Sequence, residues 1–196
     1  WPDHRADRAT RRTDGRRAMT PPLDLVDAAG AISPDVFVIA DTHFLHQNVI
    51  TYADRPPDHD LVMLTRWVET VADDDVVLHL GDLTLGKQHD FAAIAAQLTG
   101  TKYLIRGNHD RRSDAWYAAH GFTAIEPFTA TVLGRRVHFS HEPLAVKHPA
   151  LVNVHGHVHR GNHHRGATNP SQGYVNVSVE VIDYRPVPLG ALLATL

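Results

Sequence analysis

The chain has 196 residues, of which 43% are hydrophobic, and a formal net charge of −3. This length and composition predict one domain with a full hydrophobic core. The absence of cysteine excludes disulfides, thiolate catalysis and sulfur-ligated zinc or iron–sulfur sites, so any metal must be held by nitrogen and oxygen. The sixteen histidines are an unusual excess that invites a metal-binding interpretation.

The charge is distributed unevenly along the chain. Residues 1–18 carry six arginines and three aspartates, which leaves thirteen basic and nineteen acidic residues, or −6, for the remainder. We expect residues 1–33 to be a disordered basic tail and linker, followed by one domain over residues 34–196. The body is therefore not a basic nucleic-acid-binding surface. With no apolar stretch near 18 residues and no secretory leader, we expect a cytoplasmic protein that does not contact membranes.

In the first half of the chain, short apolar runs alternate with helical patterns. Runs rich in β-branched residues predict buried strands at residues 36–40, 76–80 and 102–106. Apolar spacing and capping residues predict helices at residues 61–71, 91–98 and 114–120. This alternation is typical of an α/β arrangement.

The second half is richer in predicted strands. Residues 129–133 and 136–139 flank a Gly-Arg turn and predict a β-hairpin. Residues 151–154 predict a further strand, and residues 173–182 alternate as a strand does before a final apolar segment at 189–196. Together the two halves predict an α/β (α+β) fold in which a sheet, or a pair of sheets, is covered by helices.

Metal-binding side chains recur directly after five of these strands. The five stretches are Asp41-Thr-His43, Gly81-Asp82, Gly107-Asn108-His109-Asp110, Ser140-His141 and Gly156-His157-Val158-His159. In open α/β sheets, ligands bind beyond the carboxyl ends of the strands, so we expect these side chains to converge. An Asp-x-His or His-x-His spacing lets two side chains of the same parity point into one crevice.

The number and type of candidate ligands predict two metal ions. The candidates are Asp41, His43, Asp82, Asn108, His141, His157 and His159. They are too many for one tetrahedral zinc, and the two oxygens of Asp82 can bridge two cations. Two metals about 3.5–4 Å apart suit in-line displacement at phosphorus by a hydroxide that bridges them, which predicts a phosphoesterase. His109 is not needed as a ligand and is a candidate catalytic general acid.

The order of these motifs resembles the calcineurin-like metallophosphoesterase superfamily over residues 37–159. The resemblance implies that the domain at 34–196 is a four-layer αββα sandwich of two mixed β-sheets flanked by helices. It assigns one metal to Asp41, His43, Asp82 and His159. It assigns the other metal to Asp82, Asn108, His141 and His157, with His109 as general acid. Further stretches, around His46, Asn48, Arg55-Pro56, Asn176-Val-Ser-Val and Tyr184-Arg-Pro-Val, are similar to a group of small stand-alone bacterial phosphoesterases.

One position departs from the superfamily pattern. Many of its phosphatases carry a second aspartate three residues after Gly-Asp, which orients the histidine of the Asn-His pair. Here Leu85 occupies that position. Asp110 is adjacent to His109 in sequence, but adjacency does not establish a hydrogen bond, so the sequence leaves the orientation of His109 open.

The metals and the substrate are less narrowly predicted. The mixed nitrogen and oxygen ligands suit two divalent ions, with Mn²⁺ as our first expectation and Fe, Zn²⁺, Ni²⁺ or Co²⁺ as alternatives. Candidates for binding substrate phosphate lie beside the metal motifs, at His46, Arg55, Arg111 and Arg160. A solvated surface role suits the arginines equally well.

We expect hydrolysis of phosphomonoesters or phosphodiesters in a phosphorylated small molecule or nucleotide. One alternative is a metal-dependent nuclease acting on single-stranded or damaged nucleic acid, for which a steep salt dependence of cleavage would argue. The other, from a different class, is a non-catalytic metal-binding scaffold, for which loss of Asn108 or His109 would be the sequence mark. Both residues are present. The oligomeric state is open.

Overall fold

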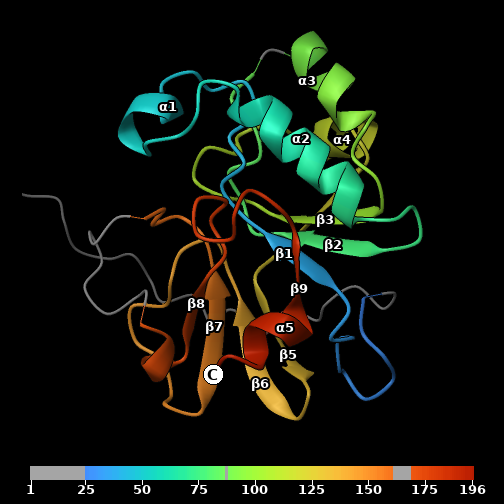
Figure 1. Ribbon diagram of the computed structural model, residues 1–196. Coiled ribbons are helices and arrows are strands. Elements are labelled where there is room, and N and C mark those ends of the chain that lie inside the picture. The colour runs from blue at the N-terminus through green and yellow to red at the C-terminus, as the bar shows by residue number, and fades with distance from the viewer. Residues whose placement is uncertain (1–24, 87, 161–168) are drawn as a thin grey trace, which may run out of the picture.

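Two β-sheets lie at the centre of the protein, as seen in a computed structural model that describes residues 25–86, 88–160 and 169–196 (Figure 1). The first sheet has the strand order β4-β3-β2-β1-β9. Its strands are β1 (Phe37–Ile39), β2 (Val76–His79), β3 (Thr101–Ile105), β4 (Phe122–Ile125) and β9 (Val187–Pro188). The four strands β1 to β4 run parallel, and β9 pairs antiparallel with β1.

The second sheet has the strand order β5-β6-β7-β8. Its strands are β5 (Phe128–Val132), β6 (Arg135–Phe139), β7 (Leu151–His155) and β8 (Tyr174–Asn176). The hairpin β5–β6 is antiparallel, as predicted, whereas β6, β7 and β8 run parallel. Buried side chains of both sheets belong to one hydrophobic core.

Helices flank the two sheets. Figure 1 shows three of them over one face of the first sheet: α2 (His59–Thr70), α3 (Gln88–Ala95) and α4 (Asp114–Ala119). The short helix α1 (Val49–Tyr52) precedes them, a 3₁₀ turn (Pro170–Gln172) lies between β7 and β8, and α5 (Leu189–Leu193) follows β9. The expected sandwich of two mixed β-sheets with flanking helices is confirmed. Within the described ranges, no helix has the length and apolarity that crossing a membrane requires.

Local sequence explains most of these elements. In α2, Met63 and Trp67 are four residues apart and both are buried, as the apolar spacing predicted. In α4, the side chain of Ser113 accepts a hydrogen bond from the backbone N–H of Trp116, which is the predicted cap. The short elements α1, β4 and β9 were not predicted.

Two segments near the ends of the predicted domain differ in detail from the sequence pattern, and the domain bounds themselves stay a prediction. Residues 1–24 lie outside the described residues, but residues 25–33, expected to be linker, pack on the second sheet. Leu25 and Ile32 are buried there, and the Ile32 N–H donates to the carbonyl of Thr131.

The strand predicted at 173–182 ends early, at Asn176. The chain then crosses to the first sheet, where the N–H of Ala40 donates to Val177 and the N–H of Val179 donates to Ala40. All four residues from Val177 to Glu180 are buried, so this stretch does not alternate between the core and solvent. The segment 176–180 thus joins the two sheets directly behind the end of β1.

Candidate metal centre

Each predicted ligand lies just beyond the carboxyl end of a strand. Asp41 and His43 follow β1, Asp82 follows β2, and Asn108 follows β3. In the second sheet, His141 follows β6, and His157 and His159 follow β7. Since all five strands have a parallel neighbour in register, their carboxyl ends meet at the junction of the two sheets. The predicted convergence is therefore what the structure shows.

Five of these residues have a left-handed backbone. Their φ angles are +57° for Asp41, +46° for His43, +58° for Asp82, +72° for His157 and +47° for His159. For residues other than glycine this conformation is uncommon and costs on the order of 1–3 kcal/mol. Such strain is typical of functional sites, where the surrounding structure holds the turn in place.

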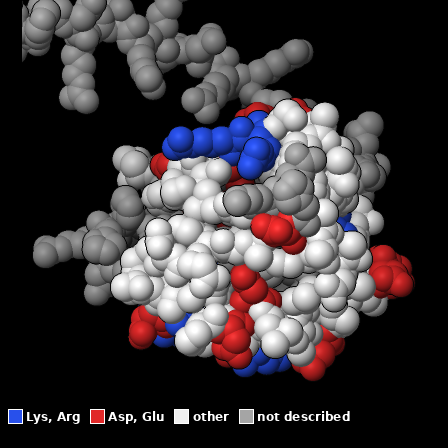
Figure 2. All heavy atoms as spheres, turned by 90° about the horizontal axis from the view of Figure 1, so that it is seen from above, with Lys and Arg blue, Asp and Glu red and all other residues white. Residues whose placement is uncertain are grey.

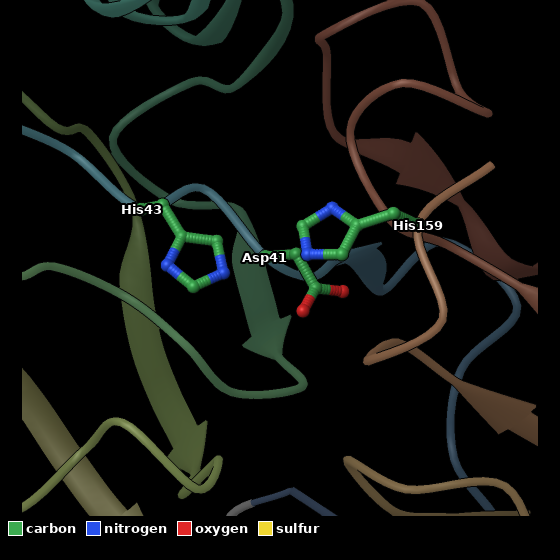
Figure 3. A group of neighbouring side chains, drawn as sticks. All are labelled: Asp41, His43 and His159. Carbon is green, nitrogen blue, oxygen red and sulfur yellow. The ribbon is translucent and has the colours of Figure 1, made fainter. Parts of the chain in front are cut away.

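The first ligand group consists of Asp41, His43 and His159, whose side chains gather at one point (Figure 3). One potential ligand atom from each lies within 4.8 Å of the others. The rings of His43 and His159 are stacked, with centroids 5.4 Å apart. Asp41 Oδ1 and both ring nitrogens of His43 are buried and have no hydrogen-bond partner in the described part of the chain. Leaving such atoms unpaired is costly, and a bound cation would satisfy them.

The second ligand group consists of Asn108, His141 and His157. Asn108 Oδ1 lies 3.0 Å from His141 Nε2 and 3.0 Å from His157 Nδ1, and these two nitrogens are 3.2 Å apart. Metal–ligand bonds of about 2.1 Å in tetrahedral or octahedral geometry place neighbouring ligand atoms about 3.0–3.4 Å apart. The three atoms thus already have the spacing of ligands around one ion.

The tautomer of His141 strengthens this interpretation. Its Nδ1 lies 2.8 Å from the carbonyl oxygen of Leu80, which can only accept, so Nδ1 carries the proton and donates. Nε2 then presents a lone pair toward Asn108 Oδ1, which is also an acceptor. Two facing acceptors are stabilised by a cation between them, and a ligating histidine commonly donates its other N–H in this way.

Asp82 lies between the two groups. Its Oδ2 is 3.4 Å from His43 Nε2 and 3.5 Å from His141 Nε2. Its Oδ1 accepts a hydrogen bond of 2.9 Å from the backbone N–H of His109. One oxygen is thus held by the protein, and the other faces a histidine from each group.

Burial sets the charge of the first group. Burial is the main reason that the pKa of Asp41 is raised to about 6; His141 and His159 oppose this rise, and the nearby charge of Asp82 adds to it. Burial, with Arg55 nearby, lowers the pKa of His43, so this imidazole is neutral. Neutral imidazoles and crowded carboxylates are suited to binding cations.

A buried ion pair between Glu180 and Arg55 supports the first ligand group. Glu180 Oε1 accepts from His159 Nδ1 at 2.9 Å and from Arg55 Nε at 2.6 Å. His159 Nε2 is thereby left available as a ligand. The hydrogen bond from His159 and the charge of Arg55 lower the pKa of Glu180 although burial acts to raise it.

The structure gives Arg55 a role other than the substrate binding expected from the sequence. Its side chain is buried, and its guanidinium also donates to the backbone carbonyls of Thr42 and Asp41, at 2.7 and 2.5 Å. All three guanidinium nitrogens are therefore engaged inside the protein. Arg55 orients the turn that carries the Asp41 and His43 ligands.

The segment 176–180 supplies further support. The Ser178 hydroxyl contacts Asp41 Oδ2 at 2.8 Å, and the same oxygen accepts from the backbone N–H of His157 at 2.8 Å. The Asn176 side-chain amide donates to the carbonyl of His159 at 2.7 Å. Close packing of the turns also explains Gly156, because a Cβ there would collide with the Asp41 carboxylate.

Asp110 does not orient the His109 ring; it holds two ligand turns together. Asp110 Oδ2 accepts from the backbone N–H groups of Asp82 and Gly107, at 2.7 and 2.8 Å, and Oδ1 accepts from that of Leu83 at 3.1 Å. The carboxylate is buried and ties the end of β2 to the end of β3.

His79 supports the same turn from within β2. Its Nδ1 accepts from the Gly81 N–H at 3.1 Å, so Nε2 carries the proton and donates to the Thr42 hydroxyl at 3.0 Å. Thr42 in turn donates to the carbonyl of Leu83. Burial lowers the pKa of His79 to about 3, which keeps this chain of hydrogen bonds neutral.

The other predicted site residues lie at the edge of the two ligand groups. The half-buried His109 ring makes an edge contact with the His43 ring, with centroids 5.4 Å apart, while Leu85 is 40% exposed. The His46 ring lies 5.5 Å from that of His43. Arg111 is exposed, and its Nε donates to the carbonyl of Asn108 at 3.3 Å.

Arg160 lies beside the first ligand group, as Arg111 lies beside the second. It is exposed, and its Nε donates to the carbonyl of Glu180 at 3.0 Å. The supporting roles of Glu180, Ser178, Asp110 and His79 escaped the sequence analysis. One signal was present, because Asn176, Ser178 and Glu180 share one parity in the predicted strand and so point the same way.

Comparison with known proteins agrees with this geometry. The chain matches an uncharacterised protein of Methanocaldococcus jannaschii with 32% identity over 170 residues, covering 81% of this chain and 89% of that protein. It also matches the gene 66 protein of Mycobacterium phage D29 with 30% identity over 174 residues, covering 73% and 87%. The crystal structure of a protein of unknown function from Aquifex aeolicus superposes with a TM-score of 0.66 and 26% identity, covering 82% and 98%.

The family profile described as calcineurin-like phosphoesterase matches residues 34–187, a range that includes every predicted ligand and the supporting residues Arg55, Asp110, Ser178 and Glu180. The geometry, with candidate metal-ligand groups built from residues that follow β1, β2, β6 and β7, is consistent with that match. The chain belongs to the calcineurin-like phosphoesterase family.

Proposed function

We propose that this protein is a dinuclear metal-dependent hydrolase of phosphomonoesters or phosphodiesters. The observation that carries the proposal is the position of Asp82 Oδ2, 3.4 Å from a histidine of the first ligand group and 3.5 Å from a histidine of the second. A carboxylate in this position would be able to bind both ions of a two-metal site. The mixed nitrogen and oxygen ligands favour Mn²⁺, with Fe, Zn²⁺, Ni²⁺ or Co²⁺ as alternatives.

Most of the site residues would hold the metal ions, and one would transfer a proton. Asp41, His43 and His159 would hold one ion, and Asn108, His141 and His157 the other, with Asp82 shared. When bound, the two ions would supply an activated water nucleophile and neutralise charge on the phosphoryl oxygens.

His109 is placed to act on the leaving group of the ester. Its backbone N–H is fixed to Asp82 Oδ1, and its ring lies against His43 at the edge of the first group. From there the imidazole would protonate the departing oxygen of the ester, as a general acid near neutral pH does.

The proposal is tested by hydrolysis of a nitrophenyl phosphomonoester and the matching bis-ester. Metal-stripped protein should be inactive and should regain activity with Mn²⁺. Asp82→Ala should lose activity even with added metal, and His109→Ala should lose about 10²–10⁴-fold in kcat while still binding metal. His148→Ala, in the exposed loop before β7, is the matched control and should behave as wild type. Full activity of Asp82→Ala would rule the proposal out.

Cleavage of nucleic acid is a second candidate, and two arginines support it. Arg111 and Arg160 are exposed, each beside one ligand group, and neither pairs with a carboxylate among the described residues. Both use Nε for a backbone carbonyl, which leaves the terminal nitrogens to contact phosphate. On the face in Figure 2, by contrast, acidic side chains are scattered and basic ones lie mostly toward the edge.

We expect contacts to a nucleic acid beside the two ligand groups to include Arg111 and Arg160. Cleavage of a single-stranded oligonucleotide should then weaken as salt is raised, with Arg111→Ala and Arg160→Ala each reducing the slope of this dependence by about one. If oligonucleotides are not cleaved under conditions in which the nitrophenyl bis-ester is, nucleic acid is excluded as the substrate.

A further inference from the structure

Tyr52 is an exposed aromatic side chain at the end of α1, next to the first ligand group. It is 53% exposed, and it is the one aromatic among the large exposed hydrophobic residues of the described ranges. Its ring centroid lies 5.7 Å from that of His159, with the rings at 81°, and 5.8 Å from that of His46. In Figure 1, α1 stands apart from α2, α3 and α4.

Tyr52 is the outermost member of a group of rings. His43 stacks on His159 and also contacts the rings of His46 and His109, at 5.5 and 5.4 Å. Tyr52 contacts His46 and His159, so it lies at the solvent end of this aromatic wall. An ester whose phosphate occupies the metal centre would extend its organic part along this wall.

The chemistry of the ring favours stacking over proton transfer. A tyrosine phenol is neutral at physiological pH, because its ordinary pKa is about 10. Exposed neutral aromatic rings bind flat nucleobases by stacking, largely independently of the base.

We propose that Tyr52 determines substrate class by stacking against the nucleobase of a nucleotide-type phosphate ester. This inference rests on the proposed function, because it places the phosphate of that ester at the two ligand groups. It narrows the substrate from any phosphoester to one that carries a nucleobase. Tyr52 is thus a specificity residue, while His109 and the ligands act on the phosphate.

Binding of two uncleavable ligands to the metal-loaded protein tests the proposal. The ligands are the methylene phosphonate analogues of adenosine 5′-monophosphate and of ribose 5-phosphate, in which carbon replaces the ester oxygen; they differ by the adenine alone. Calorimetry should show the adenosine analogue binding about tenfold more tightly. Tyr52→Phe should keep this advantage, and Tyr52→Leu should abolish it while the affinity for the ribose analogue and for Mn²⁺ stays unchanged.

Equal affinities in the wild-type protein would overturn the inference, as would an adenine advantage that survives in Tyr52→Leu. In both cases the phosphate is still bound, so the proposed function stands. Failure of both analogues to bind would overturn the inference together with the phosphate site itself.

A single-stranded oligonucleotide with a 5′-phosphate distinguishes the two sources of nucleobases. If the natural substrate is a strand, the oligonucleotide should bind more tightly than the adenosine analogue, and its advantage should grow as salt is lowered. If the natural substrate is a mononucleotide, the two should bind alike. Tyr52→Leu should weaken either ligand, and an unchanged affinity for both would contradict the role of the ring.

Discussion

The two ligand groups differ in what holds them in place. The first group, Asp41, His43 and His159, is largely buried and is oriented by side chains from distant parts of the chain, notably Glu180 and Ser178. The second group, Asn108, His141 and His157, lies nearer the surface. Its best-defined support is the main-chain carbonyl of Leu80, which fixes His141.

If each group holds one metal ion, as proposed, this difference predicts that the two ions can be perturbed separately. The side chains that support the first group, such as Glu180 and Ser178, can be replaced one at a time while every candidate ligand is kept. The second group depends on the turns after β2 and β3, which Asp110 ties together through backbone N–H groups. Variants behind the first group should therefore act on metal affinity, and variants in the turns should act on the stability of the protein as well.

The largest effect is expected for Asp110→Ala. The change leaves three backbone N–H groups without their acceptor and should cost on the order of 3 kcal/mol of unfolding free energy, because each lost buried partner costs about 1 kcal/mol or more. Denaturant unfolding of the metal-free protein measures it. Asp114→Ala removes a surface ion pair with Arg106 and should cost less than about 1 kcal/mol. Equal losses in the two variants would contradict the assigned role of Asp110.

A smaller and more selective effect is expected for Glu180→Gln. Because Glu180 orients His159, its loss should weaken one of two metal-binding events about 10–100-fold and leave the other unchanged. Calorimetric titration with Mn²⁺ resolves the two events. The exposed Glu142→Gln is the control.

The Glu180→Gln change also leaves the buried Arg55 without its carboxylate, so thermal unfolding should be measured in parallel. Loss of affinity at both sites in equal measure would show a general loss of structure and would contradict separate support of the two groups.

The smallest effect is a change in pH dependence for His79→Asn. The pKa of His79 is lowered to about 3 by burial, so the unfolded chain binds more protons than the folded protein between about pH 3 and 6.5. The contribution of neutral His79 to the free energy of unfolding is fully present above pH 6.5. It is lost as the pH falls below that value, by up to about 1.4 kcal/mol per pH unit.

In His79→Asn this titrating group is gone, so unfolding free energy should fall less steeply between pH 6.5 and 4.5. Denaturant unfolding at several pH values measures the slope. His148→Asn, on the exposed loop before β7, serves as the control. An unchanged slope in His79→Asn would show that His79 is not neutral in the folded protein.

The sequence predicted the strands and the convergence of the ligands because both depend on local pattern. Each ligand follows a strand with a clear apolar run, such as 36–40 before Asp41, and parallel strands bring their ends together. A single family pattern also linked these stretches in the correct order. Where local sequence carries the information, the prediction held.

The supporting contacts could not be predicted because they join residues far apart in the chain. Glu180 meets Arg55 across 125 positions, and Ser178 meets Asp41 across 137. From the sequence, Arg55 was expected to be a cation near a metal motif, either binding phosphate or exposed to solvent. Its structural role is evident only from its burial and its three donated hydrogen bonds. The early end of β8 has the same cause, since pairing of residues 177–179 with Ala40 on the other sheet is invisible in an alternating pattern.

The central claim is that Asp82 joins two metal ions, and it is tested most directly by electron paramagnetic resonance of the Mn²⁺-loaded protein. We predict two equivalents of bound Mn²⁺ with the spectrum of a magnetically coupled pair, since a shared carboxylate places the ions about 3.5–4 Å apart. Asp82→Ala should lose the coupled signal. A single bound equivalent, or two equivalents with uncoupled spectra in the wild-type protein, would contradict the account.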